Sequence, residues 1–562
     1  MKKTQKYGML LLWVIGCLLI ISRRPDMFLN PQPWAEDAAV FIRGVLDDGW
    51  LSLFKPYAGY LHIASRTITL FAVYISFIFS QGLVWAPTIM NLFAIAISSY
   101  CAVMICSSRF EWMGKWHLRL LLSLLIILFQ GASEVYGNVT NIHWWLGITA
   151  FFLLWDVFHT GKMPSWRDIC IFCAIILSSP NGLLIFPALC LLYWNINKFK
   201  LQKEIVKIIP VFVLSAVIGG MVLMSRDNVT EGANAFTDLI PAILGYVLTG
   251  IFADLIVPNA ADFVANHSFQ ILELTGCILL VTMLLFSRKS IKKLYFPLIF
   301  LLLVIILAVV GTSGFYIPLF KENYTPNGQR YVFIPAVIVM SILVYEANAL
   351  ITRKSDYKYI KLALFGVILL FMISGIFKSY KFTPFIDYQW KKRALIYDAK
   401  GSADFCIPVN PTGWQLPLPS ACGEECMEQF VSQLPLSKIS LDHRFLVYAD
   451  TTMVKQDNIS TLRITDYSVI VYQLPELGGL QYCIINFEQA PDNGRIQLMF
   501  LSEKNELLTY PYYINTKEGK RQYIMEIIPP VPQVRFVRMD FTNFVKTTPI
   551  ILRQLDFYSL NK

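Results

Sequence analysis

Two adjacent carboxylates, Glu36 and Asp37, follow the first long apolar run of the sequence, near the start of WAEDAAVFIRGVLDDGWLSLFKPYAGYLH at residues 34–62. A carboxylate placed beside a bound hydroxyl can take up its proton as a general base. The same two acids can instead belong to the first turn of a helix, where the helix dipole favours negative charge. A metal ion between them would lack a third ligand, so neither a metal nor any other cofactor is predicted.

The residues around the acids favour the chemical interpretation. Trp34 offers an aromatic platform beside them, and Tyr57, Tyr60 and His62 add groups that can hydrogen-bond. Arg66 adds a cation. An acidic helix start alone would not need these neighbours.

Residues 36–50 predict an amphipathic helix that lies in the membrane interface. Its apolar side carries Ala38, Phe41, Ile42, Val45 and Leu46. Its polar side carries Glu36, Asp37, Arg43, Asp47 and Asp48. The carboxylates would then face the external water layer, and Gly49 is expected to end the helix.

Two later segments supply further candidate site residues. Arg330 and Tyr331 stand in NYTPNGQRYVFIPAV, at the start of an apolar run, where they could bind a ligand or anchor the chain at the interface. SEVYGNVTNIHWW carries Asn141, His143 and Trp144. Asn and His suit sugar hydroxyls and Trp suits a pyranose face, while an aromatic belt at the interface is the alternative.

Apolar segments dominate the elements that must position these residues. Of the 562 residues, 56% are hydrophobic and 15% are charged, and the mean hydropathy is +0.53. A soluble protein cannot bury so much apolar surface, so an α-helical polytopic membrane protein is predicted. The net charge of +10 does not indicate nucleic-acid binding, because Lys and Arg stand in short clusters between apolar runs.

About 11 spans are predicted, within a range of about 10–13, since a spanning helix needs about 20 apolar residues. They cover residues 8–22, 86–106, 117–132, 143–158, 168–179, 182–195, 207–225, 269–287, 293–312, 331–351 and 362–380. Segments 65–82 and 237–257 could span the membrane or lie against it.

The basic clusters then fall on one side, which predicts a cytoplasmic N-terminus and a first external loop at 23–85. The N-terminal run is interpreted as a retained span and not as a cleaved signal. Arg23 and Arg24 break the charge rule and are expected to snorkel to the far interface.

A transmembrane domain at 1–383 and an extracytoplasmic β-sandwich at 384–562 are predicted, because the last part of the chain has short alternating runs. In CIINFEQAPDNGRIQLMFLSE, two strands joined by a turn at Asp492-Asn493-Gly494 are expected. Because apolar and polar residues alternate, Ile496, Leu498 and Phe500 are expected on one face of their strand. Val537, Met539 and Phe541 are likewise expected on one face of a later strand. Four cysteines could form two disulfides: Cys406, Cys422, Cys426 and Cys483.

The acidic pair in the first external loop, followed by interfacial segments, resembles the GT-C superfamily of integral-membrane glycosyltransferases. The stretch at 34–62 is similar to that of bacterial GT-C-like proteins, and the layout of residues 1–383 resembles the serotype-converting O-antigen glucosyltransferases. The resemblance implies a bacterial inner-membrane enzyme with a periplasmic C-terminal domain. It would move a hexose, with glucose as the first candidate, from a polyprenyl-phosphate donor to a surface glycan such as O-antigen. The transfer would invert the configuration at the anomeric carbon.

The resemblance also implies roles. Asp37 is the first choice for the general base and Glu36 the second. Arg330, with Tyr331 and Arg66, would hold the donor phosphate as its charge grows. The expected substrate-binding residues are Trp34, Tyr57, Tyr60, His62, Asn141, His143 and Trp144. The implied partners are the lipid-linked donor, the glycan acceptor, membrane lipids, a donor synthase and a flippase, with no nucleic acid; the β-sandwich would bind carbohydrate.

Other functions stay open. An O-antigen polymerase or ligase would rely on arginines in large external loops and not on an acidic first loop. A transporter or lipid flippase should carry ionisable residues within its spans and repeated halves, which are not evident. An assembly protein without catalysis would tolerate the loss of both acids.

Overall fold

The computed structural model describes most of the chain. The described residues are 3–79, 82–131, 133–197, 203–224, 244, 246–257, 269–287, 290–312, 330–352, 358–391, 394, 407–411, 414–416, 436–441, 446–449, 452–456, 459–464, 469–474, 480–487, 495–504, 507–508, 512–515, 522–531, 534–542 and 550–560.

The chain divides into two compact units. The helical unit comprises Met1–Pro31, Asp48–Ala72 and Ala86–Pro384. The β-rich unit comprises Gln32–Asp47, Val73–Trp85 and Phe385–Lys562. Two pieces of the first predicted external loop therefore group with the C-terminal residues, although they are far from them in sequence.

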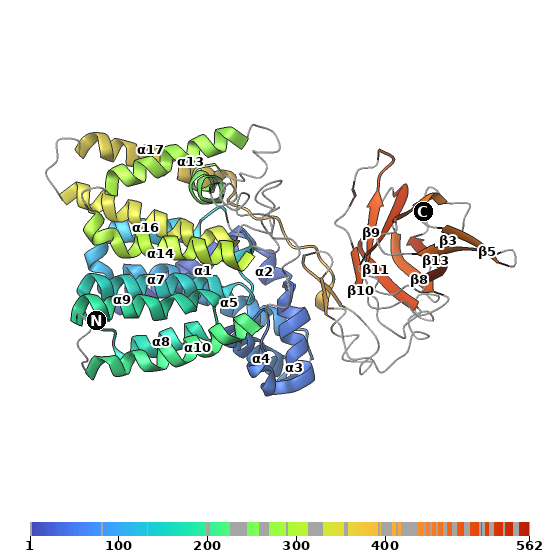
Figure 1. Ribbon diagram of the computed structural model, residues 1–562, viewed down its shortest axis with the longest axis horizontal. Coiled ribbons are helices and arrows are strands. Elements are labelled where there is room, and N and C mark those ends of the chain that lie inside the picture. Colours follow the sequence, from blue (N-terminus) through green and yellow to red (C-terminus); the bar gives the residue numbers. More distant parts are fainter. Residues whose placement is uncertain are drawn as a thin grey trace. The chain divides into compact units, whose positions relative to one another are not determined.

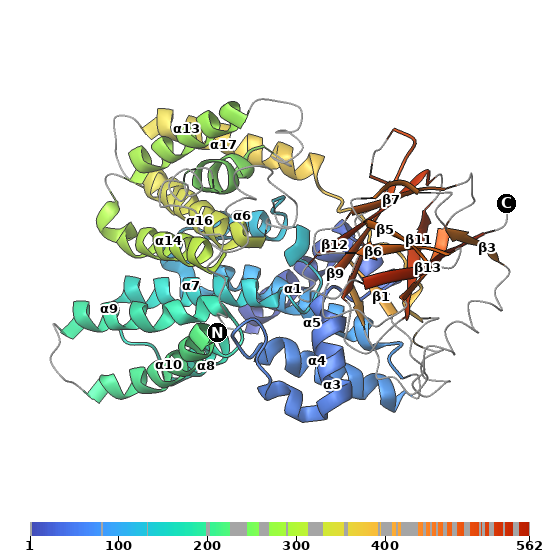
Figure 2. The same ribbon diagram turned by 45° about the vertical axis from the view of Figure 1, so that its right-hand side comes forward.

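The helical unit is built mainly from apolar helices (Figure 1 and Figure 2). Its longer helices are α1 (Lys3–Arg23), α4 (Ile63–Ile78), α5 (Ala86–Val103), α6 (Trp116–Ile127), α7 (Ile142–Thr160), α8 (Trp166–Ile176), α9 (Ile185–Asn197), α10 (Ile208–Met224), α13 (Phe269–Ser287), α14 (Ile291–Thr312), α16 (Arg330–Thr352) and α17 (Lys358–Lys378). Shorter elements include α2 (Asp26–Leu29), η2 (Gly49–Phe54), η4 (Ser108–Met113), η5 (Ser133–Val135), η6 (Pro180–Leu184), η8 (Tyr246–Phe252) and η9 (Ala253–Leu255).

Among the described residues, four helices are long and apolar enough to cross a membrane: Ala86–Cys106, Glu204–Met224, Arg330–Thr352 and Lys358–Lys378. They indicate a membrane protein. Of these, α16 is 89% buried inside the unit whereas α17 is only 17% buried, so α16 belongs to the core and α17 offers its apolar sides outward. Helices occur in all the predicted spans, while the number of spans and their topology stay a prediction.

Arg23 and Arg24 do not snorkel, which corrects the prediction made for them. Arg23 is fully buried and donates from Nη1 to the main-chain oxygens of Ile127 and Phe129, both at 3.0 Å. Arg24 donates from Nη2 to the main-chain oxygen of Tyr136 at 2.9 Å. Burial lowers the pKa of Arg24 to about 10, which leaves it charged at neutral pH. These arginines tie the end of α1 to the chain that follows α6.

The described strands of the β-rich unit form two larger antiparallel sheets and one small pair. The first has the order β10-β9-β12-β7-β4, and the second has the order β11-β8-β13-β6-β5, with β3 also paired to β13. Their bounds are β3 (Leu436–Leu441), β4 (Leu446–Ala449), β5 (Thr452–Gln456), β6 (Ile459–Ile464), β7 (Val469–Gln473), β8 (Leu480–Phe487), β9 (Arg495–Leu501), β10 (Tyr512–Asn515), β11 (Gln522–Val531), β12 (Phe536–Thr542) and β13 (Ile550–Leu560). The small pair is β1 (Ile407–Val409) with β2 (Trp414–Leu416).

The two larger sheets contact each other through aromatic side chains. Phe500 of β9 meets Phe557 of β13 edge to face, with ring centroids 6.2 Å apart, and both are fully buried. The alternation predicted for β9 and β12 is confirmed, because all six residues expected inside are buried: Ile496, Leu498, Phe500, Val537, Met539 and Phe541.

Two predictions for this unit are wrong. Strands β8 and β9 exist, but they do not pair with each other: β8 pairs with β11 and β13, and β9 with β10 and β12. The turn expected at Asp492–Gly494 lies outside the described residues. Cys483 is a buried free thiol, so the pairing of all four cysteines is not present. Cys406, Cys422 and Cys426 lie outside the described residues.

Candidate functional site

An ion pair between two distant segments lies at the start of α16. The guanidinium Nη1 of Arg330 is 3.3 Å from Oε2 of Glu134 in η5. The Glu134 side chain is 6% exposed and that of Arg330 is 26% exposed, so the arginine still reaches solvent. Tyr331 packs edge to face against Trp144 at 5.3 Å, and its main-chain oxygen accepts a hydrogen bond from the Tyr246 hydroxyl at 2.8 Å.

The connection from α6 to α7 holds Glu134 with its own polar side chains. The amides of Asn138 and Asn141 both donate to the Glu134 main-chain oxygen, at 2.6 and 3.0 Å. Trp144 in turn donates from Nε1 to Oδ1 of Asn141 at 3.2 Å. These asparagines are buried, so they shape the loop from inside, and the aromatic-belt alternative for Trp144 is not what the structure describes.

A tight turn brings Tyr60 and His62 beside this loop. Tyr57 and Tyr60 exchange two main-chain hydrogen bonds across Ala58 and Gly59, both of which have positive φ. The Tyr60 ring stacks on His62 at 3.8 Å. The His62 ring is 6.0 Å from that of His143, which lies in the first turn of α7.

The imidazole of His62 is kept neutral by its surroundings. Burial, followed by the nearby His143 and the Arg66 guanidinium, holds the pKa of His62 well below its usual value of 6.5. Arg66 donates from Nε to the main-chain oxygen of Leu61 at 3.1 Å. His143 lies within electrostatic range of Arg330, and its Nδ1 donates a hydrogen bond to the main-chain oxygen of Thr140 at 2.7 Å.

We call this group the Arg330 cluster. Nine of the residues predicted for the site belong to it or border it, and they come from three separate segments: Tyr57, Tyr60, His62, Arg66, Asn141, His143, Trp144, Arg330 and Tyr331. Glu134 is the member that the sequence did not single out as a site residue. Arginines, a carboxylate, imidazoles and flat aromatic rings can together hold an anionic group next to a hydroxyl-rich ring.

The acidic pair and Trp34 belong to the β-rich unit. Glu36 precedes η1 (Asp37–Ile42), a short π-helix that continues into α3 (Arg43–Asp48). Ala38, Phe41, Ile42 and Val45, which were predicted to share one apolar side, are all buried within the protein, and the segment turns at Gly49 with φ 56°.

Asp37, however, is only 1% exposed, so the prediction that it faces the external water layer is wrong. The helical wheel assumed an α-helix, and the wider turn of a π-helix changes which side chains share a face. Glu36 remains partly exposed. Trp34 stacks on Phe385, with ring centroids 5.0 Å apart and an interplanar angle of 25°.

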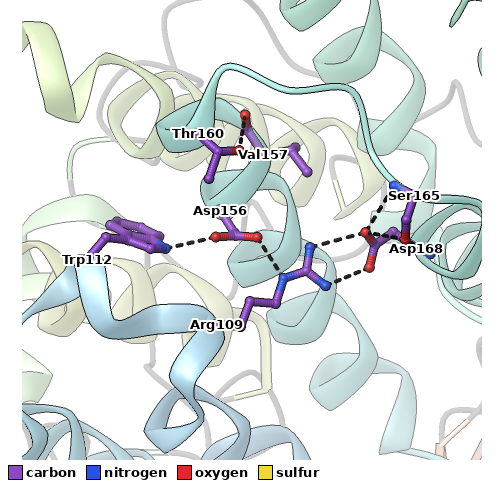
Figure 3. A network of polar contacts seen from close by, with 7 residues as sticks. All are labelled: Arg109, Trp112, Asp156, Val157, Thr160, Ser165 and Asp168. Carbon is purple, nitrogen blue, oxygen red and sulfur yellow. Dashed lines mark hydrogen bonds and ion pairs between the residues drawn. The ribbon is translucent and has the colours of Figure 1, made fainter. Parts of the chain in front are cut away.

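A second polar network, which was not predicted from the sequence, centres on Arg109. Figure 3 shows Arg109 of η4 between Asp156 of α7 and Asp168 of α8. Nε is 2.6 Å from Asp156, and Nη1 is 2.6 Å from Asp168. Burial opposes the charge of Arg109, but the hydrogen bonds that its guanidinium donates to the two carboxylates outweigh this effect and raise the pKa of Arg109. The sequence signal for one partner is the capping box Ser165-x-x-Asp168.

Within the described part of the chain, no group of three or more His, Cys, Asp or Glu side chains is arranged to hold a metal ion. The absence of a cofactor stays a prediction.

No family model matches the chain, and no curated protein matches it in sequence. Solved structures give partial matches. A low affinity xylan binding module, CBM86, from Roseburia intestinalis is 14% identical, covers 22% of this chain and 94% of its own, and has a TM-score of 0.18. A family 6 module from Clostridium stercorarium in complex with cellobiose is 13% identical over the same shares, also at 0.18. The glucuronidase BtGH115A is 11% identical, covers 67% of this chain and 44% of its own, at 0.17. TM-scores this low do not show a shared fold, so the function proposed below rests on residues of this chain.

Proposed function

We propose that the protein is a membrane glycosyltransferase that moves a hexose from a polyprenyl-phosphate donor to a surface glycan on the extracytoplasmic side. The observation that carries the proposal is the Arg330 cluster. Arg330 is partly exposed and begins a membrane-length helix. Lipid headgroups lie at the ends of apolar spans, so the phosphate of a membrane-embedded lipid would lie beside this arginine.

The composition of the cluster supports a sugar phosphate over other anions. Glu134 pairs with one nitrogen of Arg330, and the partly exposed guanidinium can donate its other N–H groups to a phosphate. Neutral His62 can hydrogen-bond to hydroxyls without adding charge, and Trp144 and Tyr331 supply aromatic surface.

The acids supply the remaining chemistry. An acceptor hydroxyl has a high pKa, so it must lose its proton to a base as it attacks the anomeric carbon. Asp37 takes that role in the proposal and Glu36 orients the acceptor. The leaving lipid phosphate needs only charge stabilisation, which Arg330 provides.

The test is sugar transfer by the purified full-length protein in vesicles that contain a polyprenyl-phosphate hexose and a lipid-linked glycan acceptor. Asp37→Asn and Arg330→Ala should each lower transfer at least about 100-fold. Asp47→Asn is the matched control, because it removes an exposed carboxylate that pairs with Arg43 in the same segment. Full activity of Asp37→Asn and Glu36→Gln would reject the catalytic role.

The same vesicles separate the rival functions. Longer glycan products without a change in sugar composition would indicate a polymerase, and movement of the donor between leaflets without transfer would indicate a flippase. The surface glycan of cells that express the wild type should gain one hexose per repeating unit.

A further inference from the structure

The acidic pair is held by the segment that follows α17. We call residues 385–416 the docking segment; it is described at 385–391, 394, 407–411 and 414–416. Gln32 donates from Nε2 to Oδ1 of Asp387 at 3.1 Å. Trp34 stacks on Phe385, and β2 of the docking segment packs against η1, which begins with Asp37. The docking segment therefore contacts the chain on both sides of the two acids and at the helix that Asp37 begins.

Asn410 is the residue that connects the two segments. Its main-chain oxygen accepts the N–H of Ala35, and it forms a β-bridge with Trp34. Its side-chain Oδ1 accepts the N–H of Ile386 at 2.9 Å, while Nδ2 donates to the Ile386 oxygen, also at 2.9 Å. The side chain is buried, with the whole residue 3% exposed. The side-chain amide of Asn410 thus holds the docking segment at Ile386, and its backbone holds Trp34 and Ala35, the two residues that precede the acids.

The backbone just before the acids has an unusual conformation. Ala35 has φ 33°, in the left-handed region that side chains other than glycine rarely adopt. Such a conformation persists only where the surroundings hold it. Ala35 is 3% exposed and lies directly between Trp34 and Glu36. The direction in which the chain leaves Trp34, and with it the position of both carboxylates, depends on these surroundings.

We propose that Asn410 is a positioning residue for Glu36 and Asp37, so that the C-terminal region forms part of the catalytic machinery in addition to any carbohydrate-binding role. The inference rests on the proposed function, because it assumes that the two acids take part in transfer. It goes beyond that function by assigning a site residue to the region after the last predicted span.

The experiment compares full-length Asn410→Ala and Asn410→Asp in the vesicle assay, with hydrogen exchange of residues 32–42 measured by mass spectrometry. Asn410→Ala should lower kcat about 10- to 100-fold, the range expected for misplaced catalytic groups, with KM for the donor nearly unchanged. Exchange in 32–42 should become faster. Asn410→Asp keeps the acceptor for the Ile386 N–H but loses the donor, so it should be intermediate.

The matched control is Asn486→Ala near the end of β8, where Gln522 and Gln554 are the register neighbours. It removes an asparagine side chain from the same unit but not from the docking segment, and it should leave kcat and the exchange of 32–42 at wild-type values.

Three outcomes would overturn the positioning role. The first is wild-type kcat and exchange in both Asn410 variants. The second is faster exchange with wild-type kcat while Asp37→Asn is inactive, since the acids would then be catalytic without needing this contact. The third is a loss of active protein without a change in kcat per folded molecule, which indicates a purely structural contact. If Asp37→Asn and Glu36→Gln are fully active, the proposed function itself fails, and the positioning role fails with it.

Discussion

Replacing Arg109 by glutamine removes the cation that joins η4 to α7 and α8. Asp156 and Asp168 have side chains that are 9% and 7% exposed, so each carboxylate would lose its charged partner while staying largely out of water. Breaking a buried ion pair costs about 3–5 kcal/mol, because one charge remains uncompensated. The Arg109 side chain is 34% exposed and water partly screens the pair, so we expect a loss of about 2–3 kcal/mol for Arg109→Gln.

The assay is the free energy of unfolding of the purified protein in mixed micelles. Arg43→Gln is the matched control, since Arg43 is also 2.6 Å from a carboxylate, but Asp47 is 36% exposed. That exposed pair should contribute less than about 1 kcal/mol. Adding Asp156→Asn and Asp168→Asn to Arg109→Gln should recover part of the loss, because no buried charge is then left alone. Equal losses for Arg109→Gln and Arg43→Gln would refute the reasoning.

Three further predictions concern the cluster, the packing and the pH response. Arg330→Lys should keep a charge but lose the fork that binds two phosphate oxygens, so transfer should fall about 10-fold and remain above Arg330→Ala in the vesicle assay. Gly182→Ala would place Cβ 2.6 Å from the main-chain Cα of Ile176, which should destabilise the helical unit by about 1–3 kcal/mol in micelle unfolding, whereas Gly366→Ala meets nothing within 4 Å and should be neutral or slightly stabilising. His62 binds a proton less readily in the folded protein than in the unfolded one, so its contribution to the free energy of unfolding should be constant above pH 6.5 and decrease below it, by at most about 1.4 kcal/mol per pH unit. The His62→Gln protein should lack this pH-dependent decrease when its free energy of unfolding is compared with that of the wild type between pH 5 and 8.

Features that depend on local pattern were predictable from the sequence. The run at 86–106 coincides with the membrane-length helix Ala86–Cys106, and 207–225 with α10, because apolar length and helix length are tied directly. The alternation in β9 and β12 was equally readable, since successive strand residues face opposite sides. Arg330 and Trp144 were recognised as unusual polar and aromatic residues at the ends of apolar runs.

Features that depend on distant partners were not predictable. Arg23 follows an apolar run, which predicts a position at the membrane interface. Its hydrogen-bond acceptors are the main-chain oxygens of Ile127 and Phe129, and no residue near Arg23 in the sequence indicates them. Strands β8 and β9 are consecutive and looked like a hairpin, but sheet membership is decided by β12 and β13, which come later in the chain. Asn410 gave no signal, because an asparagine before a proline is ordinarily a turn residue.

The grouping of residues 32–47 with the docking segment also fixes an order of events during synthesis. At about 5–20 residues per second, roughly 20–70 s separate the appearance of residue 47 from that of residue 410. Throughout that interval Trp34 lacks Phe385 and Ala35 lacks the oxygen of Asn410. A growing chain therefore cannot assemble its acidic segment until nearly three quarters of the protein has been made.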